Sequence, residues 1–485
     1  MKYSLSKRID NLLVILCLTF IGSIYAYISV TSHNHFQTFG WDLGFFDQII
    51  WKASRGDLVA YSTIAKENLL ADHFQVVLYL LAPLYYVWND ARVILIAQAF
   101  LVVFAAYPLF ILAKTVSKNI IFSLAVVISY LLFLGTQWTI LNEFHQMAFA
   151  PLFLILIFYA LHFKKTWSYW IGILGLLITK EELALLVSSI GVVVWWAYKY
   201  KNRGIFTILL GIFSFFFLIY FLMPLLSVNG TYSHYDFGEA GFTPLDVIKK
   251  SITNPIFFAK SLVYPTIKIE TLFYSLFPFG FLPLLSPLHL IPIAENLVTR
   301  FIYAGPQFTK WANVNHHAAP LGILLSVSTL YSSLIVAKFL SARKKIKTTI
   351  TLALIGLYIL LASMVQDILL HGPIHSIFKP SLYQDASWME NTRAIIKHIP
   401  PNQPVAAQNN LVPHLSARDK IYILPEIVDA EYLVVDFHDS PNAYSPLTLA
   451  QMKELVADLI STKQFTIDYQ KGDAIVLKRN KSIVQ

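Results

Sequence analysis

Long apolar runs recur along the first three quarters of the chain, and short polar segments separate them. A helix needs about 20 residues to cross the roughly 30 Å of bilayer hydrocarbon. The runs that reach or approach this length are residues 11–30, 92–113, 119–135, 147–163, 183–198, 205–226, 316–337 and 348–366. This pattern predicts an all-α polytopic membrane domain.

Lysine and arginine residues gather in short clusters between the apolar runs. The clusters are Lys2/Lys7/Arg8, Lys114/Lys118, Lys164/Lys165, Lys199/Lys201/Arg203 and Lys338/Arg343/Lys344/Lys345/Lys347. Cytoplasmic loops of membrane proteins carry an excess of these residues, so we expect the N-terminus and all these clusters in the cytoplasm. Only two crossings then fit between the first two clusters, and residues 74–88 are predicted not to cross.

The same parity sets the expected number of crossings. It requires a pair of crossings between Lys165 and Lys199 and an even number within residues 255–293. We therefore expect about ten to twelve transmembrane helices in residues 1–366. The predicted outer loops are residues 31–91, 136–146 and 227–254.

The sequence becomes polar after residue 366. Short β-branched runs alternate there with helical patterns, and residues 447–460 have the pattern of an amphipathic helix. Residues 367–485 are therefore predicted to form a small C-terminal α/β domain on the extracytoplasmic side. This segment lacks a glycine-rich phosphate loop, which disfavours nucleotide binding.

The overall composition supports a membrane protein and narrows the alternatives. Charged residues make up only 13% of the chain, whereas a soluble protein usually carries about 25%. The net charge of +9 lies in the short clusters between apolar runs, so nucleic-acid binding is not expected. Cys17 is the only cysteine, which excludes an intramolecular disulfide and a thiolate zinc cluster. The N-terminal run lacks a small-x-small cleavage site, so we expect an uncleaved first span in the plasma membrane.

Ionisable residues mark the predicted outer loops. The candidate site residues are Asp42, Asp47, His73, Glu143, His145, Lys180, Glu181, Glu182, His316 and His317. Charges near hydrocarbon are costly and often functional, although each carboxylate could simply be solvated and Lys180 could simply neutralise a glutamate. Asp42 and Asp47 lie in "WDLGFFD", whose aromatic residues suit the interface, where a desolvated carboxylate can act as a base. Their i, i+5 spacing directs at most one toward a substrate, unless the backbone breaks at Gly44.

Some of these residues could also bind a metal ion. Asp42 and Glu143 could hold a hard divalent cation such as Mg²⁺ or Mn²⁺, which prefers carboxylate oxygens. His316 and His317 are adjacent and cannot easily bind one ion from a helix face, so a zinc site has little support. The histidines otherwise offer hydrogen-bond donors for a phosphate or a sugar.

Five motifs resemble, in order, those of a known family. They are "WDLGFFDQIIW", "ADHFQVVLYLLAPLYYVW", "EFHQMAFAPLFLILIFYAL", "TKEELAL" and "HHAAP". They resemble the predicted membrane proteins called domain of unknown function 2079, over roughly residues 10–440. That family is similar to the GT-C superfamily of glycosyltransferases. The resemblance implies an inverting transfer of a sugar from a polyprenyl-phosphate donor to a hydroxyl of a glycan, lipid or protein acceptor, at the outer face and among membrane lipids.

The resemblance also implies roles for individual residues. Asp42, in the first outer loop, corresponds to the general base, and Glu143 and His145 fall in the second outer loop, where such enzymes keep another acidic residue. In the family pattern a proline and an acidic residue follow that histidine, whereas Gln146 and Met147 stand here. A second carboxylate role in this loop therefore falls on Glu143 alone.

Two other classes of function remain alternatives. A lipid or solute transporter or flippase would also bury charges, but usually near the midplane of two repeated halves. The chain has no visible repeat, and its acids lie at the outer rim. A non-catalytic membrane scaffold that displays the C-terminal domain is the other alternative.

Overall fold

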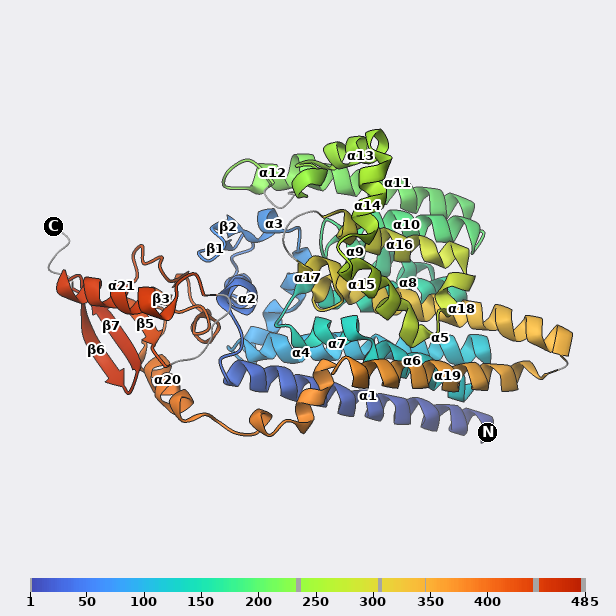
Figure 1. The fold of residues 1–485 in the computed structure, drawn as a ribbon, viewed down its shortest axis with the longest axis horizontal. Helices are drawn as coiled ribbons and strands as arrows, with labels where there is room; N and C mark the ends of the chain where they lie inside the picture. Colours follow the sequence, from blue (N-terminus) through green and yellow to red (C-terminus); the bar gives the residue numbers. More distant parts are fainter. Residues whose placement is uncertain (1, 233–236, 304–307, 345, 439–444, 481–485) are drawn as a thin grey trace.

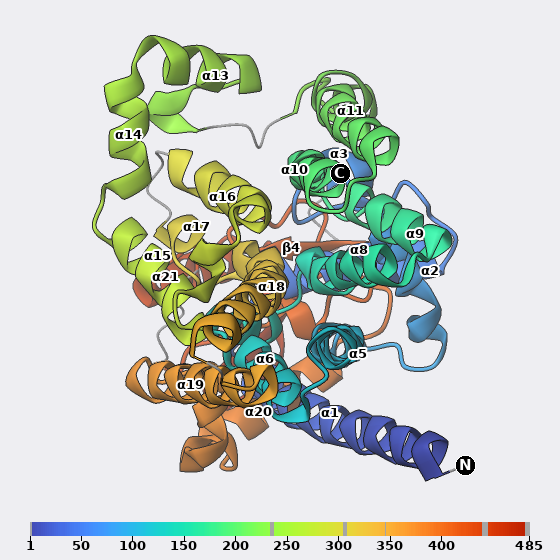
Figure 2. The ribbon, with the colours of Figure 1, turned by 90° about the vertical axis from the view of Figure 1, so that its right-hand side faces the viewer.

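The computed structural model describes residues 2–232, 237–303, 308–344, 346–438 and 445–480. A helical bundle occupies one end of the molecule, and a small α/β unit occupies the other (Figure 1). The long helices α1 (Lys2–Asn34), α18 (Ala319–Lys344) and α19 (Thr348–Leu369) run along the bundle. An end-on view shows α13 (Pro244–Thr253) and α14 (Pro255–Val263) at its rim (Figure 2).

The remaining helices connect these elements. In chain order they are α2 (Phe45–Ser54), α3 (Leu69–Asp72), α4 (Arg92–Phe104), α5 (Ala106–Ser117), α6 (Ile120–Leu132), α7 (Leu134–Leu141), α8 (Ala150–Phe163), α9 (Thr166–Leu177), α10 (Leu183–Trp196), α11 (Lys201–Phe217), α12 (Met223–Leu226), α15 (Ile267–Leu276), α16 (Pro287–Ile302), α17 (Phe308–Trp311), α20 (Ser387–His398) and α21 (Leu449–Ser461). All the apolar runs predicted to span the membrane are helical.

Among the described residues, six helices are long and apolar enough to cross a membrane. They are Ile9–Asn34, Arg92–Ser117, Gln146–Phe163, Lys201–Leu226, Phe308–Arg343 and Thr348–Leu369. The pair α6 and α7, bent by 51°, would make a seventh. Helices α9 and α10 are apolar but shorter. The chain is therefore a polytopic helical membrane protein, and the total of about ten to twelve crossings stays a prediction.

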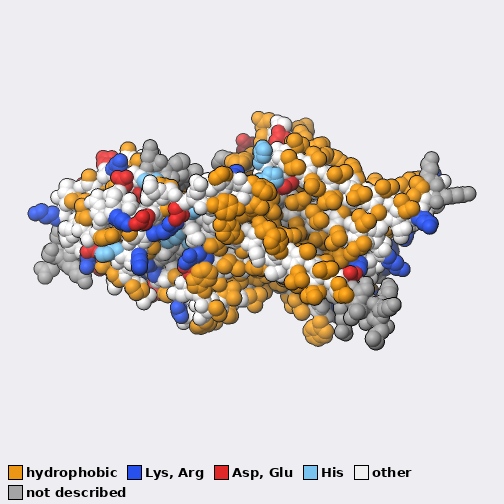
Figure 3. Space-filling model, turned by 90° about the horizontal axis from the view of Figure 1, so that it is seen from below, with side chains coloured by type: hydrophobic (Ala, Val, Ile, Leu, Met, Phe, Trp, Pro, Cys, Tyr) orange, Lys and Arg blue, Asp and Glu red, His pale blue; other side chains and the backbone are white. Residues whose placement is uncertain are grey.

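Contacts between loops agree with the predicted parity. Lys114 pairs with Asp10 at 2.7 Å, and the Asn119 side chain donates to the carbonyl of Thr349 at 2.7 Å, so these loops share one end of the bundle. Residues 76–86 form two short 3₁₀ helices, and that residues 74–88 do not cross stays a prediction. On the face seen in Figure 3, hydrophobic side chains cover the bundle between charged side chains on the α/β unit and at the opposite end. The side of the membrane that each end faces stays a prediction.

The C-terminal unit is a five-stranded mixed sheet with two helices. The strands are β3 (Val405–Ala407), β4 (Ile421–Ile423), β5 (Tyr432–Asp436), β6 (Phe465–Lys471) and β7 (Ala474–Arg479), in the order β4-β3-β5-β7-β6. β3 is parallel to β4 and β5, whereas β7 is antiparallel to β5 and β6. Helix α21 begins with a capping box between Thr448 and Gln451 and covers one face through apolar side chains such as Val456. The predicted small α/β unit is confirmed.

The first outer loop lies between this sheet and the bundle. This loop carries α2 and a hairpin of β1 (Tyr61–Ser62) and β2 (Glu67–Asn68). The Thr63 hydroxyl donates to the carbonyl of Ile421 at 2.6 Å. A Cβ atom on Gly40 would stand 2.9 Å from Ile423, and one on Gly44 would stand 2.9 Å from Val412. A larger residue at either position would therefore require these side chains to shift, and the loop shares one hydrophobic core with both partners.

The arrangement predicts opposite accessibility at its two ends. In a Cys17→Ala background, a membrane-impermeant maleimide should label Glu454→Cys in intact cells, because that position is exposed on the predicted outer domain. It should label Lys165→Cys only after permeabilisation, because that residue lies in a predicted cytoplasmic cluster. Labelling of Lys165→Cys in intact cells would overturn the predicted orientation.

Candidate functional site

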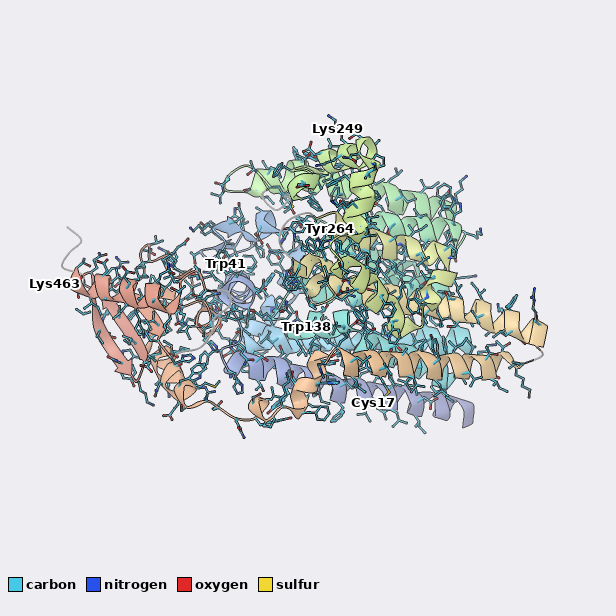
Figure 4. The ribbon with its side chains drawn as sticks, viewed as in Figure 1. Cys17, Trp41, Trp138, Lys249, Tyr264 and Lys463 are labelled. Atoms are coloured by element: carbon cyan, nitrogen blue, oxygen red, sulfur yellow. The ribbon has the colours of Figure 1, made fainter. Side chains whose placement is uncertain are left out.

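Asp42 lies in a π-helical turn, Gly40–Gly44, that leads directly into α2. The Glu143 carboxylate holds this turn from the second outer loop. Its Oε2 accepts hydrogen bonds from the backbone N–H groups of Phe39 at 2.9 Å and Leu43 at 3.1 Å. The neighbouring Trp41 is 54% exposed and lies between the bundle and the sheet (Figure 4). One carboxylate thus positions the other.

The Glu143 backbone is itself strained and supported. Its φ of +61° is a left-handed conformation that a residue with a side chain rarely adopts. Gln98, from α4, fixes it by donating to the carbonyls of Ile140 at 2.9 Å and of Glu143, and by accepting from the N–H of His145 at 2.8 Å. The surrounding helices therefore determine where the Glu143 carboxylate lies.

Asp42 and Glu143 form an interacting carboxylate pair. Burial raises the pKa of Asp42, and burial together with the charge of Asp42 raises the pKa of Glu143. Within the described part of the chain, no group donates a hydrogen bond to the half-buried Asp42 carboxylate. Because the two charges repel, the pair retains a proton more readily than two isolated carboxylates would. Asp42 is the member left available to another molecule.

The candidate histidines stack beside this pair. The rings of His145 and His316 lie 3.2 Å apart at 12°, and those of His316 and His317 lie 4.2 Å apart. Phe46 contacts the His145 ring edge-on at 5.1 Å. Burial lowers the pKa of His145, and nearby His316 and Lys180 lower it further. His145 is therefore neutral and able to donate or accept a hydrogen bond.

Glu181 is the centre of a buried polar network. Its Oε1 lies 2.8 Å from His73 Nδ1 and accepts from the Tyr232 hydroxyl at 2.7 Å, while its Oε2 accepts from the Phe74 N–H at 3.1 Å. Burial alone would raise the pKa of Glu181. The charges of His73 and Lys180, together with hydrogen bonds from His73 and Tyr232, instead hold this pKa well below its usual range. Glu181 is an ionised, fully paired carboxylate.

Lys180 pairs with the other glutamate of this turn. Its Nζ lies 3.3 Å from Glu182 Oε1, and the lysine side chain is buried whereas the Glu182 side chain is 44% exposed. Lys180 also lies close enough to His145 to act on it electrostatically. A buried ammonium thus stands between the histidines and the solvent-facing edge of the turn.

Asp47 faces away from this cluster. It is 1% exposed, and its carboxylate accepts hydrogen bonds from the hydroxyls of Tyr85 at 2.6 Å and Ser416 at 2.7 Å. Burial raises the pKa of Asp47 to about 7. The carboxylate therefore ties the first loop to the C-terminal sheet unit, and the i, i+5 spacing directs Asp42 alone toward the cluster.

The other proposed site residues form two connected groups. Ring contacts, ion pairs or electrostatic interactions join His145, His316, His317, Lys180, His73, Glu181 and Glu182. Asp42 and Glu143 form a second group, which Gln98 connects to His145 through the backbones of Glu143 and His145. In the described ranges, no group of three or more His, Cys, Asp or Glu side chains is arranged to hold a metal ion. Asp42 and Glu143 supply only two carboxylates, and Phe39 and Leu43 already occupy Glu143 Oε2. Asp42 and Glu143 alone would not complete the coordination of Mg²⁺ or Mn²⁺, which would need water or substrate phosphate oxygens as further ligands, and such an ion stays a prediction.

Several supporting residues were missed from the sequence. Gln98 lies within an apolar run and Tyr85 lies in an aromatic segment, so a polar group among apolar neighbours was the available signal. Ser416 stands 369 positions from Asp47 and carries no local signal. Tyr232 likewise reaches Glu181 only through the fold.

The fold and this site define a polytopic membrane protein with a polar cluster at one end of its bundle. Residues 32–475 match the family described as "Predicted membrane protein (DUF2079)", and the chain belongs to that family. No curated protein matches the chain.

The chain is also similar to solved structures of ArnT from Cupriavidus metallidurans. The structure bound to undecaprenyl phosphate is 10% identical, with 96% of this chain and 98% of that chain covered and a TM-score of 0.47. The apo structure is 11% identical, with 96% and 97% covered and a TM-score of 0.49.

The role of Glu143 as a structural acceptor can be tested by stability. Glu143→Ala leaves two backbone N–H groups without their acceptor and should lower the free energy of unfolding by about 2–6 kcal/mol, since each lost partner costs about 1–3 kcal/mol. Glu143→Gln keeps an acceptor oxygen and should cost less. Thermal unfolding in detergent measures both, with Glu454→Ala, at an exposed glutamate, as the control. Equal stability of Glu143→Ala and wild type would contradict this role.

Proposed function

We propose that the protein is an inverting glycosyltransferase of the plasma membrane. It moves a sugar from a polyprenyl-phosphate donor to an acceptor hydroxyl at the outer face. The observation that carries the proposal is the Asp42–Glu143 pair, which leaves the Asp42 carboxylate available on a turn held by Glu143. Two residues after Glu143, His145 leads to the buried Lys180 and to His316. The similarity of its family to GT-C glycosyltransferases supports the same assignment.

Asp42 has the properties that a general base requires. Its raised pKa brings proton affinity closer to neutral pH, where a base transfers protons efficiently. In the proposed reaction Asp42 takes the proton of the acceptor hydroxyl, and the acceptor oxygen attacks the anomeric carbon of the donor. The bond from that carbon to the phosphate oxygen breaks, and polyprenyl phosphate leaves. A single displacement inverts the anomeric configuration.

The groups around the pair suit the departing phosphate. Lys180 is a compact positive charge, and an ammonium in a buried setting stabilises developing negative charge strongly. His145 and His316 add hydrogen-bond donors at the same place. Trp41, exposed beside Asp42, offers an aromatic face for a sugar or for the lipid interface.

The catalytic assignment predicts unequal effects of two isosteric variants. Asp42→Asn keeps the shape and removes the base, so transfer should fall by about two to four orders of magnitude while donor binding is retained. Asp47→Asn should cost less, because Asp47 binds Tyr85 and Ser416 away from the cluster. The assay measures transfer of a radiolabelled sugar from a panel of polyprenyl-phosphate donors in reconstituted membranes. Undiminished transfer by Asp42→Asn would remove Asp42 from the chemistry, and substrate flux without any transfer would favour a transporter.

The phosphate role of Lys180 predicts a specific order of donor affinities. Lys180→Ala should bind a polyprenyl-phosphate sugar more weakly than Lys180→Arg, because arginine keeps the positive charge. Lys249→Ala, at an exposed outer-loop lysine, is the matched control and should bind like wild type. Donor affinity is measured on the protein in nanodiscs. Equal affinity of wild type and Lys180→Ala would leave Lys180 as a counter-ion of Glu182.

A further inference from the structure

A polar groove lies outside the proposed catalytic cluster, between the end of α1 and the C-terminal unit. It consists of two adjoining cavities of about 510 and 310 Å³, which share Asn34, Arg92 and Arg393. We call it the α1 groove. Asn34 ends α1, Arg92 begins α4, and Arg393 lies on α20, which stands beside the end of α1 in both ribbon views (Figures 1 and 2). Asp42 and Glu143 line neither cavity.

The two arginines that both cavities share are each paired with an aspartate, and the smaller cavity is lined further by Asp47, Lys397 and Arg418. Arg92 makes two hydrogen bonds to Asp90, at 2.7 and 2.6 Å. Arg393 makes two to Asp385, at 2.5 and 2.8 Å, and also donates to the carbonyl of Asn34 at 3.3 Å. The carboxylates already neutralise both guanidinium groups, and they would repel an incoming phosphate. A ligand with hydroxyl groups can instead accept from the arginines and donate to the aspartates.

The mouth of the groove is aromatic and open. Tyr27, on α1, and Tyr383, in the segment before α20, have ring centroids 6.1 Å apart at 27°. Their side chains are 50% and 59% exposed, so both rings present free surface. Aromatic rings bind the apolar faces of sugars while neighbouring polar groups bind the hydroxyls. Tyr27 belongs to a predicted membrane span, which places this mouth at the outer edge of the bilayer.

We propose that the α1 groove binds a neutral glycan, between the Tyr27–Tyr383 pair and the two arginine–aspartate pairs. The larger cavity has room for a sugar unit of a lipid-linked or free glycan. Its role as an acceptor subsite rests on the proposed transferase function, whereas glycan binding itself does not. A binding experiment therefore separates failure of this proposal from failure of the transferase.

The test compares ligands on the full-length protein in phosphatidylcholine nanodiscs. Native mass spectrometry measures binding of monoglucosyl diacylglycerol against phosphatidylglycerol, and saturation-transfer NMR measures a panel of neutral disaccharides. We expect the glycolipid to bind in preference to the anionic lipid. Binding of the glycolipid alone supports a lipid-linked glycan, and binding of the disaccharides as well supports a free one. Preference for phosphatidylglycerol, or no binding of any sugar, would overturn the proposal.

Matched variants locate the binding. Asp385→Asn and Tyr383→Ala change exposed groove side chains and should each weaken glycan binding by about tenfold, the effect of losing one or two good contacts. The first control is Glu390→Gln, on α20, where Glu390 forms an exposed ion pair with Lys471 of β6. The second is Phe378→Ala, at an exposed aromatic residue outside both cavities. The controls should bind like wild type. Equal binding by the groove variants and the controls would place the glycan elsewhere.

Discussion

The hydrogen bonds from Phe39 and Leu43 to the Glu143 carboxylate are the constraint on which the end of the bundle next to the sheet depends. They join the two predicted outer loops and fix the turn that carries Asp42. This geometry requires a strained backbone conformation at Glu143, which hydrogen bonds to Gln98 stabilise. Because the acceptor is a carboxylate, the same contact also sets the charge beside Asp42. Position and proton affinity of the proposed base are therefore coupled in one residue.

The ionisable residues at this end are tolerated because most are paired inside the protein. Glu181 binds His73 and Tyr232, Lys180 binds Glu182, and Asp47 binds two hydroxyls. A buried charge without such partners would be costly. Asp42 is the exception among the proposed site carboxylates, since no described group donates to it. That exception distinguishes a group available for chemistry from the groups that hold its surroundings together.

The apolar runs predicted the helices because length and hydropathy decide which segments can enter a bilayer. The small C-terminal α/β unit also followed from local patterns, and the i, i+5 spacing of Asp42 and Asp47 indicated that at most one of them points toward a substrate. The partners of the site residues did not, because Ser416 and Tyr232 reach the site from distant parts of the chain. The α1 groove was likewise invisible, since α1, α4 and α20 build it together. Local periodicity carries no information on which distant side chains meet.

The close packing of Gly40 and Gly44 against Val412 and Ile423 has a consequence for biosynthesis. The first loop emerges early, but its inner surface is completed only by residues near the end of the chain. During synthesis the turn that holds Asp42 therefore stays partly uncovered until the residues of the sheet unit have been made. The proposed site is complete only after the C-terminal unit has folded, so a chain that ends before the sheet would contain the membrane helices but not the complete site.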